Sequence, residues 1–267
     1  SFADSYGRAA VNSNYSGTVA VVKYRGAHGI NAQGSYTWSH SLDYSSAFFG
    51  STGDFGFPSN GNNLKAEYGN SAFDLRHRFV GYYTVPLPIG PGHKVLGSSN
   101  IVSREAFEGW VVSGITEIQS GLPFTVYLST ATDYSGFNQF ADRPNVGVGR
   151  LKQHNKTPDA AFDTTYFTPI GAGAVGSERR DQYFGPGLVN FDLSTSKDFF
   201  LGSERYKLQF RADLFNLFNH TNFANPTALF SSSSFGKITS TVGNATTGTG
   251  GVIGGARLAQ FALRFNF

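Results

Sequence analysis

Long runs in which apolar and polar residues alternate are the feature that most restricts how this chain can fold. At 257–267, one set of alternate positions is mostly apolar and the other is mostly polar. The first set is Arg257, Ala259, Phe261, Leu263, Phe265 and Phe267. Successive side chains of a β-strand point to opposite faces of a sheet. The pattern therefore predicts a strand with one apolar face and one polar face.

The same alternation recurs along the chain and predicts about seven long strands. They lie at 15–24, 30–43, 75–87, 107–126, from 189 onward, at 206–214 and at 257–267. The pattern slips near Phe215, which indicates a bulge or a strand end. Neighbouring runs form hairpins, so we expect an all-β fold, an antiparallel up-and-down meander.

The connections between these runs alternate between short and long. Short turns lie at 25–29 and 202–204, and a longer piece follows Pro88, whereas 45–73, 128–187 and 220–255 are long. Loops of that length are usually functional or disordered. Barrels of the bacterial outer membrane place short turns on the periplasmic side and long loops outside.

The length of the runs favours a membrane barrel over a soluble β-sandwich. A strand needs about 9 to 11 residues to cross a bilayer, and soluble strands are shorter on average. Tyr and Trp also occur near the ends of the runs, where an amphipathic ring fits the membrane interface. We predict part of a transmembrane β-barrel with long loops on one side; a secreted β-sandwich of lectin or adhesin type is the soluble alternative.

Composition and motifs exclude several other functions. The formal charge of +3 is spread along the chain, so we expect no nucleic-acid partner. The chain has no Cys, its six His are scattered, and no nucleophile elbow, phosphate loop or dinucleotide fingerprint is present. We therefore expect no metal, no cofactor and no enzymatic activity.

Three sets of segments resemble a known family. They are DLRHRFV at 74–80 with VPLPIG at 85–90, GWVVSGI at 109–115 with QSGLPFTV at 119–126, and LQFRADLFNLFNHTNF at 208–223. Together they resemble the barrel of Oar-like TonB-dependent outer-membrane receptors, from about residue 14 to 267. The terminal alternating strand, with Phe261, Leu263, Phe265 and Phe267, resembles the signal that the barrel assembly machinery recognises.

The resemblance implies a receptor or transporter in the bacterial outer membrane. Such proteins have a barrel of about 22 strands filled by an N-terminal plug, which contacts TonB. We expect residues 1–267 to be a single barrel segment, the C-terminal part of a larger barrel without its plug. The implied partners are outer-membrane lipid, the barrel assembly machinery and, through the missing plug, TonB.

Two stretches of the long loops, 48–57 and 134–143, are the expected ligand contacts. The candidate residues in them are aromatic or charged: Phe48, Phe49, Asp54, Phe55, Phe57, Tyr134, Phe137 and Arg143.

The odd strand number motivates an alternative function. Bacterial single-chain barrels have even strand numbers, and an open sheet leaves two unpaired edges. Unpaired edges template association. The alternative is a released β-rich fragment that pairs with other copies of itself into a structural tube, filament or multi-chain barrel, outside the cell.

Overall fold

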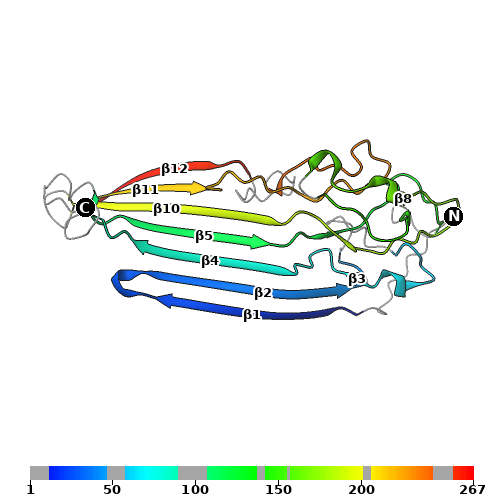
Figure 1. Cartoon of the computed structure of the whole chain (residues 1–267), viewed down its shortest axis with the longest axis horizontal. Helices are drawn as coiled ribbons and strands as arrows, with labels where there is room; N and C mark the ends of the chain where they lie inside the picture. Colours follow the sequence, from blue (N-terminus) through cyan, green and yellow to red (C-terminus); the bar gives the residue numbers. More distant parts are fainter. Residues whose placement is uncertain are drawn as a thin grey trace.

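The sheet of this protein consists of consecutive antiparallel strands. The computed structural model describes residues 12–46, 58–89, 107–136, 142–154, 157–200, 206–242 and 255–267. The long strands are β1 (Asn14–Arg25), β2 (Asn31–Asp43), β4 (His77–Pro86), β5 (Val111–Gln119), β10 (Leu188–Phe200), β11 (Lys207–Phe215) and β12 (Leu258–Asn266). They pair in sequence order (Figure 1), and the predicted all-β meander is confirmed. The two-residue strand β3 (Gly69–Asn70) pairs with the end of β2.

The predicted strand at 107–126 was too long. The structure ends β5 at Gln119, and the chain then turns away into a separate two-stranded sheet, where β6 (Pro123–Phe124) pairs with β9 (Tyr183–Phe184). At the turn, Gly121 lies directly against the backbone carbonyl of Gly185, where any side chain would collide. Alternation continues through this turn in the sequence, so periodicity alone missed it. The slip at Phe215, by contrast, is the end of β11.

The register gives the sheet one apolar and one polar face. One row of directly paired residues crosses all seven long strands: Tyr24, Ala32, Tyr83, Gly114, Leu193, Leu214 and Ala259. The adjacent row, on the opposite face, is polar: Arg25, Asn31, Thr84, Ser113, Ser194, Asp213 and Gln260. A period of two, kept in register over every strand, produces this separation.

The connections lie at two ends of the sheet according to their length. The turn between β1 and β2, which contains the 3-10 helix η1 (Ala27–Gly29), is at the end opposite the three long connections (Figure 1). His28 adopts a left-handed conformation there, with φ of 59°. The described residues of the long connections, 44–76, 120–187 and 216–257, lie side by side, and we call them the loop layer.

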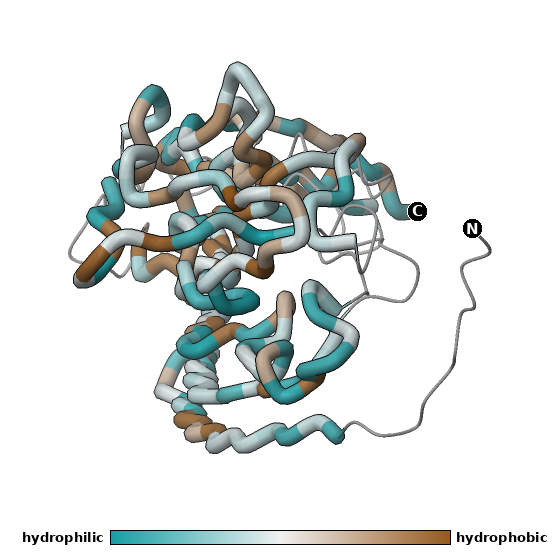
Figure 2. The backbone as a smooth tube through the Cα atoms, turned by 90° about the vertical axis from the view of Figure 1, so that its right-hand side faces the viewer, coloured by the Kyte–Doolittle hydropathy of each residue, from teal (hydrophilic) through white to brown (hydrophobic). Residues whose placement is uncertain are grey.

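Short elements organise the loop layer. Besides β3, β6 and β9, a second small sheet pairs β7 (Asn145–Val146) with β8 (Phe167–Thr168). Three 3-10 helices complete it: η2 (Leu64–Glu67), η3 (Pro158–Ala160) and η4 (Thr164–Tyr166). Seen from this end, apolar and polar segments alternate through the layer (Figure 2).

The hydrophobic core lies in the loop layer. The buried cluster consists of Phe124, Val126, Ala161, Phe162, Phe167, Tyr183 and Ile238. Phe162 is at its centre, with its ring 5.8 Å from that of Phe124, 5.7 Å from that of Phe167 and 5.3 Å from that of Phe235. The core therefore joins residues of the second and third long connections.

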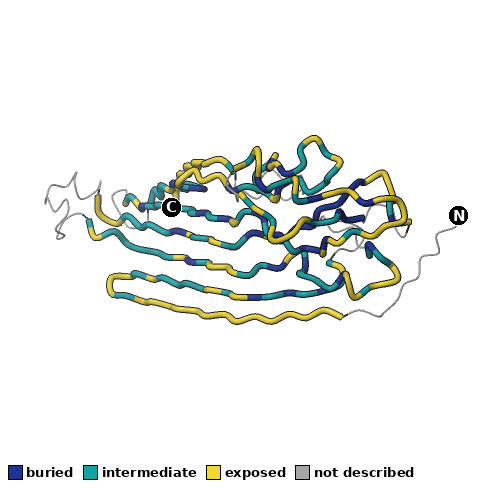
Figure 3. Tube along the Cα trace, turned by 45° about the vertical axis from the view of Figure 1, so that its right-hand side comes forward, coloured by how far each residue is buried: buried dark blue, intermediate teal, exposed yellow. Residues whose placement is uncertain are grey.

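The sheet is open within the described residues. β1 and β12 form its two edges, and β1 is exposed along its whole length (Figure 3). All pairings between consecutive long strands are antiparallel, so the first and the seventh run in the same direction.

Candidate functional site

A buried arginine fastens the first and second long connections to the end of the sheet. Arg180 donates a hydrogen bond from Nη2 to the backbone carbonyl of Asp43, at 2.6 Å, and a second to the Asp43 carboxylate. Its Nε donates to the carbonyl oxygen of Glu67 at 3.1 Å, and its Nη1 pairs with Asp181 at 3.2 Å. Because Asp43 ends β2 and Glu67 ends η2, Arg180 fixes both relative to β9.

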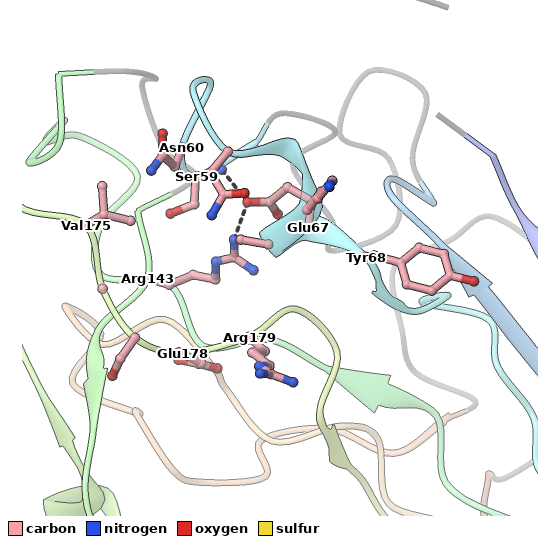
Figure 4. Close-up of a pocket in the computed structure, with 13 residues that line it drawn as sticks. Ser59, Asn60, Glu67, Tyr68, Arg143, Val175, Glu178 and Arg179 are labelled. Carbon is pink, nitrogen blue, oxygen red and sulfur yellow. Dashed lines mark hydrogen bonds and ion pairs between the residues drawn. The ribbon is translucent and has the colours of Figure 1, made fainter. Parts of the chain in front are cut away.

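A second buried ion pair lies beside the first. Arg143 donates from Nη2 to Oε1 of Glu67, and the same oxygen accepts a hydrogen bond from the backbone N–H of Ser59 at 3.0 Å. The two charged side chains are only 4% and 5% exposed. Figure 4 shows Arg143 reaching toward Glu67 from the opposite connection. The pair therefore holds residues 59–67 against the start of β7.

A polar pocket opens beside this ion pair. Its volume is about 490 Å³, within the range of small-molecule sites. Its lining comes from two of the long connections (Figure 4): Ser59, Asn60, Asn63, Lys65, Ala66, Glu67, Tyr68, Arg143, Val175, Gly176, Ser177, Glu178 and Arg179.

Three buried polar atoms of this lining have no hydrogen-bond partner among the described residues. They are Oγ of Ser59, Nη1 of Arg143 and Oε2 of Glu178. The other carboxylate oxygen of Glu178 accepts from the backbone N–H of Val126 at 2.9 Å. Since most buried polar side-chain atoms in proteins are paired, three such atoms around one pocket indicate a site with capacity for a polar ligand.

Burial also changes the protonation of Glu178. Loss of hydration raises the pKa of its carboxyl well above the usual range, and Asp181 adds to the rise. The hydrogen bond from Val126 and the charge of Arg143 lower this pKa, with smaller effect than burial. A protonated Glu178 can donate a hydrogen bond from the oxygen that has no partner.

Comparison with known proteins assigns a family. The family model described as "Outer membrane beta barrel domain" matches residues 5–260. The chain belongs to this outer-membrane β-barrel family. No curated protein and no solved structure matches the chain. The assignment agrees with the long amphipathic strands of the sheet, and it places this outer-membrane β-barrel domain in the bacterial outer membrane.

The structure places two of the eight expected ligand-contact residues of this outer-membrane β-barrel domain. Arg143 lines the pocket. Tyr134 lies in the same connection, where its backbone N–H donates to Asp142 and its carbonyl accepts from Gly173. It is not in the pocket lining, so the structure does not bring the two together in one site. The other six lie outside the described residues: Phe48, Phe49, Asp54, Phe55, Phe57 and Phe137.

The other pocket residues had no sequence signal. Ser59 and Glu67 precede Arg143 by a large separation in sequence, and Glu178 follows it. No motif spacing links them, because the fold of the loop layer brings them together.

The expected assembly signal lies on the apolar face of the edge strand β12. Phe261, Leu263, Phe265 and Phe267 are 68%, 69%, 50% and 85% exposed. Aromatic rings stack along this face, with the ring of Phe265 5.9 Å from that of Phe267 and 6.4 Å from that of Tyr206. Recognition by the barrel assembly machinery stays a prediction.

The described residues of this outer-membrane β-barrel domain contain neither a cluster of metal ligands nor a membrane-spanning helix. In the part of the chain that the structure describes, no three His, Asp or Glu side chains gather in a way that could hold a metal ion. Within the same ranges, no helix is long and apolar enough to span a membrane.

Proposed function

We propose that this chain is part of the wall and external loops of a TonB-dependent receptor that takes up a ligand through a plug-gated barrel. The observation that carries the proposal is the polar pocket in the folded loop layer at one end of an amphipathic sheet. Outer-membrane barrels have their long loops outside the cell, so the pocket would face the medium. The proposed role is capture and transport, not catalysis.

The two faces of the sheet support this arrangement. The apolar face, with exposed side chains such as Leu263, would lie against lipid. The polar face carries ion pairs, including Arg78, which donates to one Glu117 oxygen from Nε at 2.9 Å and from Nη2 at 2.7 Å. Charges on this face would meet water or a plug domain, which avoids the cost of burial in hydrocarbon.

The experiment that tests the proposal examines the mature polypeptide in the outer membrane. Mass spectrometry is expected to find a plug domain N-terminal to Ser1, and crosslinking in cells is expected to join that polypeptide to TonB. A porin of the same membrane is the control for the crosslink. A mature polypeptide that starts at Ser1 and gives no TonB crosslink would overturn the proposal.

The open edges favour a second candidate, assembly of several copies. β1 is exposed throughout and β12 almost throughout, so both offer unpaired backbone groups. Copies inserted with the same orientation would join β12 of one to β1 of the next as a parallel pair, because the two strands run in the same direction. If an odd number of other strands lay between β12 and β1 instead, every pair in the closed barrel would be antiparallel. This geometry favours completion of the barrel by other strands.

Disulfide crosslinking separates these candidates. The chain has no native Cys, so a Cys introduced near the middle of β1 and another in β12 supply its only thiols. A ladder of crosslinked copies is expected from self-assembly. A crosslinked product that never exceeds one copy contradicts it.

A further inference from the structure

The charges around the pocket are predominantly positive. Lys65 and Arg179 are exposed at its rim, and Arg143 lies buried within it. Glu67 balances one of these charges through its ion pair with Arg143. The remaining carboxyl, Glu178, is the group whose charged form burial disfavours. A pocket with this balance attracts anions.

The buried groups without partners favour an oxygen-rich ligand. Nη1 of Arg143 can only donate, and Oε2 of Glu178 donates when protonated. Both therefore match an acceptor such as a carboxylate or phosphate oxygen, and hydrogen bonds to such charged groups are the stronger kind. Ser59, Asn60 and Asn63 add hydroxyl and amide groups on the side of the first long connection, which suit ligand hydroxyls.

Loop bracing explains only part of this site. A purely structural role, in which the ion pair holds the two connections together, requires two contacts: Arg143 Nη2 with Glu67, and Glu67 with the Ser59 N–H. Both are made. It gives no role to Nη1 of Arg143 or to Oε2 of Glu178. A buried polar group that stays unpaired destabilises the fold.

We propose that the pocket binds the anionic group, carboxylate or phosphate, of a small hydroxylated ligand. Arg143 and Glu178 hold the anion, Ser59 binds an adjacent hydroxyl, and the rim residues Lys65 and Arg179 attract the ligand from the medium. This inference rests on the proposed function, because it names the class of ligand that such a receptor would capture.

Three sugars that differ at one carbon test the inference: glucose, glucuronate and glucose 6-phosphate. Calorimetric titration uses the intact outer-membrane protein, purified in detergent. Either anion or both are expected to bind at least about tenfold more tightly than glucose, which is the effect of one charged hydrogen bond. Preference for glucuronate identifies a carboxylate site, and preference for the phosphate identifies a phosphate site. Equal binding of all three, or no binding of either anion at millimolar concentration, overturns the inference.

Variants locate the binding to this pocket. Arg143→Lys keeps a cation beside Glu67 and removes the guanidinium, so the affinity for the anion is expected to fall about tenfold. If that variant fails to fold, Arg179→Gln at the exposed rim still tests the site, since it should weaken anion binding severalfold and leave glucose unaffected. Arg150→Gln removes an exposed charge of the same connection outside the pocket and is the matched control. Equal effects of Arg179→Gln and Arg150→Gln contradict the inference.

The two proposals can fail separately. One outcome is anion binding that depends on Arg143 and Arg179 in a protein without a plug or TonB crosslink. It supports the anion site and contradicts the proposed receptor type. The opposite outcome is a plug and a TonB crosslink in a protein whose anion binding is unaffected by both variants. It supports the receptor type and contradicts the anion site.

Discussion

Hydrophobic side chains are exposed on the seven long strands, which we call the barrel wall, and buried in the loop layer. On the apolar face of the wall, Phe261 and Leu263 are 68% and 69% exposed. In the loop layer, Val126 and Phe162 are 0% and 3% exposed. Figure 3 shows the same contrast, with the exposed strand β1 at one edge and buried segments gathered among the long connections.

The difference shows that two kinds of stability coexist in one chain. The wall is held by its antiparallel hydrogen-bond ladder, and its apolar face needs an apolar solvent such as lipid. The loop layer has a packed core and buried ion pairs of its own, Arg143 with Glu67 and Arg180 with Asp181, so it excludes water by itself. Arg180 links the two, because it binds Asp43 at the end of β2 from within the loop layer. We therefore expect the two regions to respond separately to most substitutions.

The largest expected effect comes from the centre of the loop-layer core. Phe162→Ala removes a ring that contacts Phe124, Phe167 and Phe235, and a buried Phe→Ala change costs about 3–5 kcal/mol. Limited proteolysis is expected to cut the loop layer much faster. Both Trp residues, Trp38 and Trp110, lie in or beside wall strands, so the fluorescence transition of the wall should be unchanged.

A matched substitution tests whether the effect comes from burial. Val148 is fully exposed in the same connection, and Val148→Ala should leave proteolysis unchanged. Loss of the wall's fluorescence transition in Phe162→Ala would show that the two regions unfold as one. That result would contradict their separate stability.

The next largest effect is expected on the wall. Leu193 and Ser194 are neighbours in the middle of β10 and point to opposite faces. Leu193→Arg places a charge on the proposed lipid face at a cost of about 2–4 kcal/mol. Ser194→Arg places the same charge on the polar face, opposite Asp213, and should cost far less. Chemical unfolding in lipid vesicles, followed by tryptophan fluorescence, measures both; equal costs would contradict the assignment of the faces.

The same contrast explains how much of this structure could be predicted from the sequence. The wall strands repeat one local rule, a period of two, and their pairing follows chain order. The sequence therefore revealed all seven strands and the alternation that separates the two faces of β12. It failed at Gly121, where the alternation continues although the chain leaves the sheet to pair β6 with β9.

The site depends on contacts that no local rule describes. Ser59, Glu67, Arg143 and Glu178 are brought together by the packing of separate connections. Of these, only Arg143 was among the predicted ligand contacts, because it is a charged residue in an aromatic loop. Burial decides which of these charged side chains form ion pairs. In an irregular loop layer the buried positions follow no regular period, so the sequence pattern does not reveal them.

The third prediction concerns a single proton in the loop layer. Burial raises the pKa of Glu178 above its ordinary value of 4.5, so the folded state holds this proton more tightly than the unfolded state does. The resulting stabilisation is complete below the ordinary pKa and is lost as the pH rises through the raised pKa of the folded state. Proteolysis of the loop layer should therefore accelerate over that pH window.

Glu178→Gln removes the titrating group and keeps an acceptor for the Val126 N–H. This variant should lose the part of the pH dependence that Glu178 causes, while the fluorescence transition of the wall keeps its own pH profile. Identical pH profiles of proteolysis in the variant and the parent protein would show that Glu178 is not the group responsible.

The smallest effect is expected from the polar face of the wall. Arg78 and Glu117 pair across β4 and β5, with side chains 48% and 17% exposed. Such an exposed pair contributes about 0.2–1 kcal/mol, because water and salt screen it. Arg78→Gln should therefore shift the unfolding of the wall only slightly at low salt and not at high salt. A large loss of wall stability that persists in high salt would show that a plug or another protein covers this face and buries the pair. The polar face of the wall would then be buried in the complete protein, as the core of the loop layer is.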